Sequence, residues 1–161
     1  MPSDKMNDTY SKLRPEPPTP KDEICDCANI SEIYLAHKLG SNPIHCLGCS
    51  GEVLPDRLEF GERLAETIAY WNSVYGSLYQ LWLDSGEYED WARDRLLDPK
   101  GQVNTTGIDL VKELSSFAKA YYLWFYENTS QAPDRCLLCG ANLIVREGIL
   151  FKFCEPCLLI T

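Results

Sequence analysis

The sequence predicts an α+β protein in which a helical middle of about three helices is flanked by two small, zinc-stapled β modules. Two observations lead to this fold class. Eight cysteines occur as four close pairs, two pairs toward each end of the chain. Between them, apolar residues recur at helical spacing. With 161 residues and 45% hydrophobic content, the chain can bury a core of ordinary size, and no apolar run is long enough to span a membrane.

The C-terminal module, predicted over residues 131–161, has the cysteine spacing of a zinc ribbon. Two Cys-x-x-Cys pairs are separated by fourteen residues, and the predicted ligands are Cys136, Cys139, Cys154 and Cys157. In a Cys-x-x-Cys turn both sulfur atoms point the same way, and backbone amides face them and stabilise the thiolates. Two such turns complete a tetrahedral shell of four sulfur atoms, which is typical of a structural zinc site.

The segment between these two pairs is predicted to form a β-hairpin. Residues 142–146 and 149–153 are strand-like, and Glu147-Gly148 supplies the turn. Gly140 directly follows the second cysteine, where such a turn commonly needs a positive φ angle. Glu155, inside the second pair, is predicted to face solvent.

The N-terminal module, predicted over residues 23–60, contains a less regular cysteine set. A Cys-x-Cys pair is followed after eighteen residues by a Cys-x-x-Cys pair, and the predicted ligands are Cys25, Cys27, Cys46 and Cys49. A strand over residues 29–36 and a turn at 38–43 connect the two pairs. His37 and His45 are predicted to lie outside the ligand set, because four cysteines already complete the shell.

The cofactors predicted from these sets are two structural Zn²⁺ ions. Four disulfides are the alternative interpretation of eight paired cysteines. The chain starts without a basic, apolar signal segment, which favours a reducing cytoplasm and therefore metal binding. Iron of the rubredoxin type also accepts four thiolates and is the other metal candidate, which the colour of the protein would reveal.

The helical middle, predicted over residues 61–130, begins with a long helix from Gly61 to Leu83. Apolar residues spaced four and three apart form one stripe on it: Leu64, Ile68, Trp71, Tyr75, Leu78 and Trp82. A second apolar stripe lies beside the first and consists of Tyr70, Val74 and Leu81. So wide an apolar face predicts a helix buried between layers.

The rest of the middle is predicted to contain two shorter helices and a strand. One helix covers residues 87–97, and the next begins near Thr106, where Thr106-x-x-Asp109 resembles a capping box. Residues 121–126 are mostly aromatic and predict a strand, with continuation of the preceding helix as the competing prediction. At the other end of the chain, residues 1–22 hold five prolines and are predicted to form a flexible tail.

The charge of the chain argues against a polyanionic partner. The formal charge is -9, and two filled four-thiolate zinc sites, at -2 each, would bring it to -13. Between Glu52 and Arg135 fifteen acidic residues face eight basic ones. Affinity for nucleic acid comes largely from Lys and Arg neutralising phosphates, and the sequence has no basic run. Nucleic-acid binding is therefore the second-ranked function.

The sequence also argues against an enzyme. A catalytic zinc ion keeps an open coordination position, whereas four cysteines close the shell. The sequence has no Gly-rich phosphate loop, nucleophile elbow or His-Glu-x-x-His motif. The carboxylates at Glu87, Glu89, Asp90 and Asp94 have the spacing of a solvated helix face.

Several short motifs carry a resemblance to a known family. They are Pro43-Ile44-His45-Cys46-Leu47-Gly48-Cys49 with Gly51-Glu52-Val53, Tyr70-Trp71, Leu81-Trp82-Leu83-Asp84-Ser85-Gly86, Tyr121-Tyr122-Leu123, and Cys136-x-x-Cys139-Gly140. From Cys25 to its end the chain resembles a bacterial family of uncharacterised zinc-ribbon-containing proteins, which are labelled as candidate nucleic-acid-binding proteins. The resemblance implies zinc binding and a cytoplasmic setting.

Together these features predict a non-catalytic, zinc-binding protein–protein interaction module of a bacterial cytoplasm. Its acidic helical body would suit a basic protein partner, for example a toxin or a nucleic-acid-processing enzyme. The alternative is a zinc-ribbon nucleic-acid-binding protein, and no membrane partner is expected.

Overall fold

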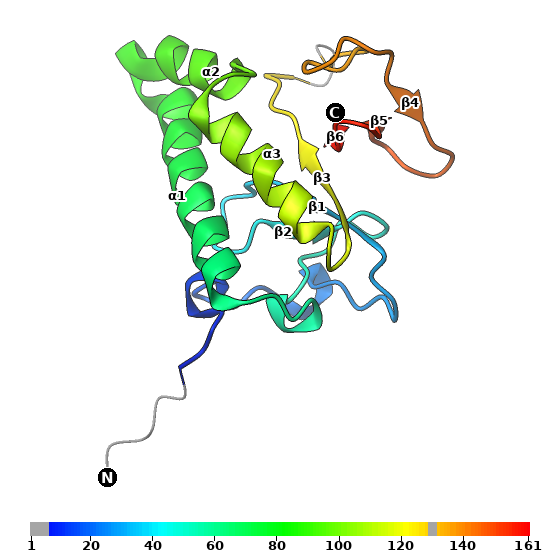
Figure 1. Cartoon of the computed structure of the whole chain (residues 1–161). Coiled ribbons are helices and arrows are strands. Elements are labelled where there is room, and N and C mark those ends of the chain that lie inside the picture. Colours follow the sequence, from blue (N-terminus) through cyan, green and yellow to red (C-terminus); the bar gives the residue numbers. More distant parts are fainter. Residues whose placement is uncertain (1–6, 129–131) are drawn as a thin grey trace.

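A mixed β-sheet forms the centre of the molecule, and the helices lie on one side of it (Figure 1). The computed structural model describes residues 7–128 and 132–161. The strands are β1 (Glu32–Leu35), β2 (Ile44–Cys46), β3 (Lys119–Leu123), β4 (Ile144–Val145), β5 (Lys152–Cys154) and β6 (Leu159–Ile160). The helices are α1 (Glu62–Asp84), α2 (Glu89–Leu97) and α3 (Gln102–Leu114). This arrangement confirms the predicted α+β class.

The sheet joins the strands of both cysteine-rich ends of the chain. Its order is β2-β1-β3-β6-β5-β4, and β3 runs parallel to both β1 and β6. The other neighbours pair antiparallel. Parallel strands need a long crossover connection, and the segment that carries α1, α2 and α3 supplies it between β1 and β3. Because β3 lies between β1 and β6, the helical crossover also fixes where the C-terminal hairpin docks.

The first apolar stripe of α1 faces the core as predicted, whereas the second is only partly buried: Val74 packs against the main core cluster and Tyr70 is exposed. Leu64, Ile68, Trp71 and Tyr75 are buried, whereas Tyr70 is 67% exposed. The prediction that α1 lies buried between layers is therefore wrong: α1 lies at the outer edge of the molecule, with α2 and α3 packed along one side of it (Figure 1). In the described part of the chain, no helix combines the length and the apolarity needed to cross a membrane.

Helix α3 begins earlier than the sequence predicts. It starts at Gln102, and Thr106 lies inside it, so the predicted capping box is wrong. The tight turn before the helix explains the difference. Gly101 N donates to Asp98 O (3.0 Å), and Gly101, in an extended conformation, is itself the N-cap residue. The chain thus enters the helix directly after the turn.

Close packing of α3 on α1 and β3 forms the middle of the core. A Cβ atom on Gly107 would lie 2.2 Å from a ring carbon of Tyr122, so this contact requires glycine. The Tyr122 hydroxyl donates to Asn104 Oδ1 (2.8 Å), and Trp71 Nε1 donates to Val103 O (2.8 Å). These bonds satisfy polar groups that burial would otherwise leave unpaired.

The strands are shorter than the apolar runs that predicted them. The strand predicted over residues 121–126 is β3, which begins two residues earlier and ends at Leu123, although Trp124 N still donates to Ile160 O (2.9 Å). The two runs of the C-terminal hairpin contribute only β4 and β5. Strand β6 was not predicted, because two residues are too few to show a periodicity.

The predicted flexible tail is wrong for the described residues 7–22, which pack against the body. Leu13 is 1% exposed and belongs to the main core cluster. The Tyr10 hydroxyl donates to Phe60 O (2.6 Å), and Arg14 pairs with Asp56 (2.8 Å). Two apolar residues in this proline-rich segment, Tyr10 and Leu13, are enough to anchor it to the body. Residues 1–6 of the predicted tail lie outside the described residues.

Substitution of the buried anchor tests this docking. Leu13→Ala should lower the free energy of unfolding by about 2–5 kcal/mol, because it empties a closed part of the core. Chemical denaturation followed by tryptophan fluorescence measures the change. Leu39→Ala is the matched control, since Leu39 is 70% exposed and its truncation should change stability little. Equal effects of the two variants would show that residues 7–22 do not pack on the body.

Candidate metal centres

The eight cysteines gather into two groups of four, and the members of each group are those predicted from spacing. One group contains Cys25, Cys27, Cys46 and Cys49, and the other contains Cys136, Cys139, Cys154 and Cys157. Within each group, all four sulfur atoms lie within 4.8 Å of one another, and all eight cysteines are free thiols. Each group could therefore hold one metal ion.

The spacing of the sulfur atoms fits a tetrahedral thiolate site. Zinc–sulfur bonds of about 2.3 Å in a tetrahedron place neighbouring sulfur atoms about 3.8 Å apart. The sulfur atoms of Cys139 and Cys154 are 3.7 Å apart. In each group two cysteines are buried and two are more accessible, so one side of each centre belongs to the core. Cys25, Cys46, Cys136 and Cys154 all belong to the main core cluster.

The N-terminal centre is assembled where the β1–β2 hairpin meets the segment before it. Strand β2 ends at Cys46, and the following turn closes when Ser50 N donates to Cys46 O (2.8 Å). Cys25 N donates to Glu52 O (2.8 Å), which brings the first pair beside this turn. A Cβ on Gly51 would lie 2.7 Å from Cys25 N, so the two pairs approach this closely only because residue 51 is glycine.

Arg57 supports the N-terminal centre, although the sequence analysis did not single it out. Its guanidinium donates to Cys25 O (3.0 Å) and to the carbonyl oxygen of Cys27, and lies 3.8 Å from Cys25 Sγ. The guanidinium thus holds the Cys-x-Cys turn and places a positive charge beside a set that carries a net negative charge when metallated. Cysteine spacing gives no signal for such a residue.

In the C-terminal centre the first turn is closed by backbone bonds between Cys136 N and Ala141 O (2.8 Å) and between Gly140 N and Cys136 O (2.9 Å). Gly140 has φ 73°, which confirms the prediction of a positive angle after the second cysteine. Ser50 (φ 62°) and Leu158 (φ 53°) occupy the same place after the other two Cys-x-x-Cys turns. The need for a positive φ is therefore a property of the turn, met by glycine in one case only.

The thiols of each group differ in acidity because backbone hydrogen bonds, burial and neighbouring thiols act on them differently. A hydrogen bond from the backbone of Ala141, with contributions from neighbouring thiols, lowers the pKa of Cys139 to about 7. Burial raises the pKa of Cys157, and the hydrogen bond with Cys49 raises the pKa of Cys27 to about 12. Four thiolates this close repel one another, whereas a divalent cation stabilises all four. Metal binding is therefore coupled to proton release.

Glu155 is partly exposed, with 34% of its side chain accessible, but its carboxylate is held by partners instead of facing solvent freely as predicted. Its carboxylate accepts hydrogen bonds from Lys119 Nζ (2.5 Å), from the Tyr121 hydroxyl (3.0 Å) and from the Arg146 guanidinium. Burial acts to raise the pKa of Glu155, but these three partners outweigh burial and lower it to about 2. Arg146 also pairs with Glu32 of β1 (2.9 Å). The network thus ties the C-terminal ribbon to the N-terminal half of the sheet.

The two histidines contact groups other than the metal centres. His45, buried in β2, lies with Nε2 3.3 Å from Ala36 O, and burial lowers its pKa to about 3. His37 Nδ1 lies 2.8 Å from Asn72 Oδ1. Neither joins the four-cysteine groups.

The comparisons with known proteins add no assignment. The chain matches no protein-family model, no curated protein and no solved structure. The resemblance to a bacterial zinc-ribbon family therefore stays a prediction.

Elemental analysis tests the metal content. Protein purified under reducing conditions should contain two zinc ions per chain, because two complete four-thiolate groups are present. Cys139→Ser should leave one zinc and expose the C-terminal segment to limited proteolysis, because metal binding is coupled to folding there. Cys49→Ser should leave one zinc with the C-terminal segment still protected. One zinc or fewer in the unmodified protein, or iron in its place, would overturn the assignment.

Alkylation tests the order of thiol acidity. With the metal removed by a chelator under conditions in which circular dichroism shows that the fold is retained, Cys139 should react with iodoacetamide before Cys157, with a rate that rises as pH increases through about 7, where the Cys139 thiolate forms. Peptide mass spectrometry gives the rate at each cysteine. Added zinc should protect both. Equal rates at Cys139 and Cys157 over this pH range would contradict the predicted difference in pKa.

Proposed function

We propose that this chain is a non-catalytic, zinc-binding protein that acts as an acidic protein–protein interaction module with a basic partner. The four-cysteine groups support the non-catalytic part, because a shell of four thiolates leaves no open position for a substrate. The proposal includes a reducing, cytoplasmic setting, in which eight thiols stay available to metal.

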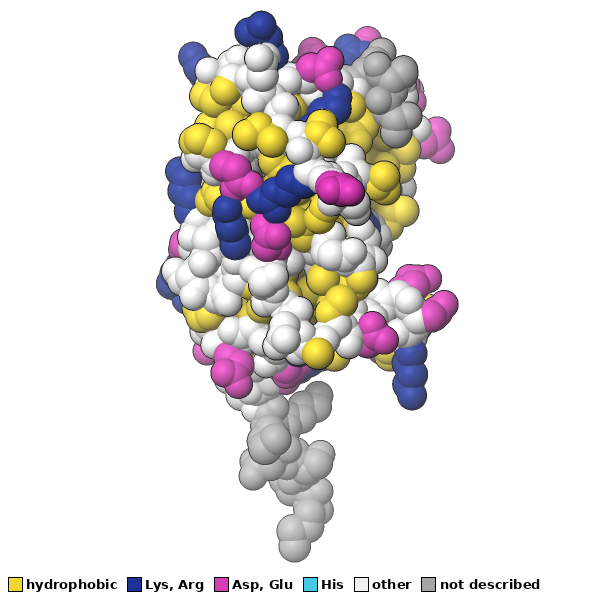
Figure 2. Space-filling model, turned by 90° about the vertical axis from the view of Figure 1, so that its right-hand side faces the viewer, with side chains coloured by type: hydrophobic (Ala, Val, Ile, Leu, Met, Phe, Trp, Pro, Cys, Tyr) yellow, Lys and Arg dark blue, Asp and Glu magenta, His cyan; other side chains and the backbone are white. Residues whose placement is uncertain are grey.

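The pairing of the basic side chains favours a protein partner over nucleic acid. Within residues 7–128 and 132–161, eight of them form ion pairs with carboxylates of the same chain: Lys12, Arg14, Arg63, Arg93, Lys112, Lys119, Arg146 and Lys152. Arg146 and Lys152 are two of the three basic residues of the ribbon, and Arg135 is the third. On the side of the molecule away from α1, basic and acidic side chains alternate among apolar ones (Figure 2). A phosphate backbone would compete with internal carboxylates for these cations.

The observation that carries the proposal is the corner where α1 turns into α2, which exposes large apolar side chains among acids. Leu83, Tyr88 and Trp91 are 46%, 53% and 52% exposed. Tyr and Trp are enriched among the side chains that contribute most to protein–protein binding. The carboxylates of this corner are those of Asp84, Glu87, Glu89, Asp90 and Asp94, all outside the core. An apolar centre with an acidic rim suits a basic partner.

The position of Asp84 adds to this argument. It is the last residue of α1, and the last turn of that helix contains no basic residue. A carboxylate at a helix C-terminus is repelled by the negative end of the helix dipole, by about 0.3–1 kcal/mol. The chain thus keeps a negative charge where its own stability disfavours it, as expected if the charge serves binding.

Charge reversal at this corner should separate binding from stability. Asp84→Lys combined with Glu87→Lys should slow association with the partner about tenfold at low salt, because rim charges steer encounter. Stability should stay equal or rise, because a lysine at residue 84 favours the helix dipole. The partner is captured from extracts of the native host, identified by mass spectrometry, and its association rate is then measured by surface plasmon resonance.

The control has the same change in charge at a distant place. Asp22→Lys with Glu23→Lys alters two exposed acids beside the N-terminal module and should leave the association rate nearly unchanged. Labelled single-stranded and duplex DNA and RNA, titrated at about 0.15 M salt, should show no micromolar binding. Micromolar binding to nucleic acid that weakens steeply with added salt would overturn the proposal in favour of the alternative.

A further inference from the structure

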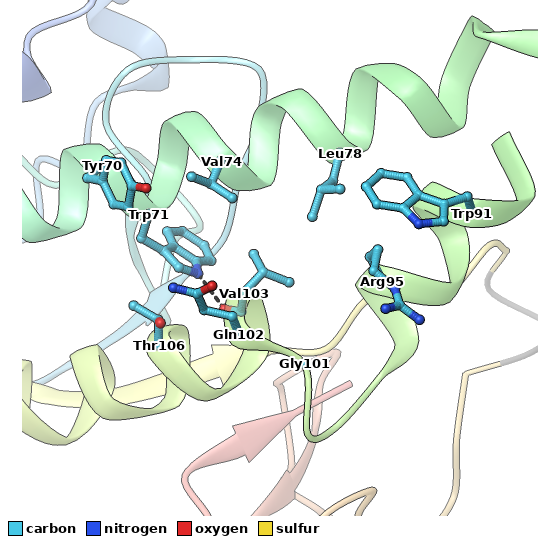
Figure 3. Close-up of a pocket in the computed structure, with 10 residues that line it drawn as sticks. All are labelled: Tyr70, Trp71, Val74, Leu78, Trp91, Arg95, Gly101, Gln102, Val103 and Thr106. Carbon is cyan, nitrogen blue, oxygen red and sulfur yellow. Dashed lines mark hydrogen bonds between the residues drawn. The ribbon is translucent and has the colours of Figure 1, made fainter. Parts of the chain in front are cut away.

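A mostly apolar pocket lies between the three helices, on the helical side of the molecule and apart from both metal centres (Figure 3). Its volume is about 320 Å³. It is lined by Tyr70, Trp71, Val74 and Leu78 of α1, Trp91 and Arg95 of α2, and Gly101, Gln102, Val103 and Thr106 around the start of α3. This volume is at the lower end of the range of pockets that bind small molecules, about 300–1,000 Å³.

The walls of the pocket offer flat apolar surfaces. Val74 and Leu78 lie along one side, and the indole ring of Trp91 points toward Leu78 (Figure 3). The Trp71 indole nitrogen is already occupied, because it donates to Val103 O, so this ring also presents an apolar surface. The half-exposed Trp91 and the more exposed Tyr70 would both lose apolar surface to water if a ligand filled the space.

Of the described residues, Arg95 is the only charged one that lines the pocket. Among the described residues it forms no ion pair, although Asp90, Asp94 and Asp98 lie close to it in the sequence and Arg93 is paired with two of them. Other basic residues among those described also lack an ion pair, for example Lys21 and Lys100, but they do not line the pocket. Arginine binds carboxylates through two parallel N–H bonds, which makes it selective for a planar anion.

We propose that this pocket binds a small carboxylate with an apolar body, held between Trp91 and the α1 wall, whose carboxylate accepts hydrogen bonds from Arg95. The charge of Arg95 selects the anion, and the apolar walls select the body. The site shares Trp91 with the acidic corner proposed to bind a protein, but Arg95 and the α1 wall belong to the pocket alone. Either proposal can therefore fail while the other stands.

The probe is 2-naphthoate, compared with 2-naphthamide, a neutral molecule of the same shape. The full-length, zinc-loaded protein is titrated while the indole N–H signals of its tryptophans are followed by NMR. We expect the signals of Trp71 and Trp91 to move, with a dissociation constant at least tenfold lower for 2-naphthoate than for 2-naphthamide. Equal affinities for the two probes, or no movement up to millimolar concentration, would overturn the proposal.

Three variants locate the binding. Arg95→Gln should weaken 2-naphthoate binding about tenfold and leave 2-naphthamide binding unchanged, and Arg135→Gln, with the same loss of charge in the ribbon, should change neither. Leu78→Trp should fill the pocket and abolish binding of both probes. If Leu78→Trp does not fold, as judged by circular dichroism, Tyr70→Ala at the exposed rim replaces it and should weaken both probes. Binding that survives the pocket variant in a folded protein would contradict the assignment.

Discussion

The parallel pairing of β3 with both β1 and β6 is the constraint on which the rest of the structure depends. Strand β3 receives the chain from the helices, and its neighbours belong to the N-terminal and the C-terminal cysteine-rich segments. Its own side chains face both sides of the sheet: Tyr122 packs into the main core cluster below the helices, and Tyr121 belongs to a smaller cluster on the opposite face. The helical body and both metal centres are thereby parts of one continuous core.

On the face of the sheet opposite the helices, a network of charged side chains also links the N-terminal and the C-terminal strands. The Arg146 guanidinium lies 4.1 Å from the centre of the Phe153 ring and pairs with Glu32 across the sheet. Cation–π contact and ion pairing act on the same group, so the guanidinium is held from several directions. Arg146 therefore serves the internal structure of the protein. The same holds for Arg57, which supports the N-terminal cysteine turn.

The helical side and the ribbon side of the molecule differ in their chemistry. The C-terminal ribbon carries one thiolate group and a network of paired charges, whereas the helical side carries exposed aromatic rings, exposed acids and the pocket that contains Arg95. Trp91 belongs to both features of the helical side, since its ring lines the pocket and is half exposed at the acidic corner. An occupant of the pocket would thus also change the surface available to a protein partner.

The sequence by itself determined the elements whose signal is local. Cysteine spacing identified both four-thiolate groups, because the geometry of a metal site restricts which pairs can share an ion, and the spacing of Leu64, Ile68, Trp71 and Tyr75 identified the buried face of α1. The positive φ angle of Gly140 was also predicted, because a Cys-x-x-Cys turn determines the backbone angle of the residue that follows it. Only the tertiary structure decided which strands pair in parallel, that Leu13 is an anchor and that Glu155 is held by three partners. Those features depend on contacts between residues far apart in the chain, where loop closure and burial, and not local spacing, set the free energy.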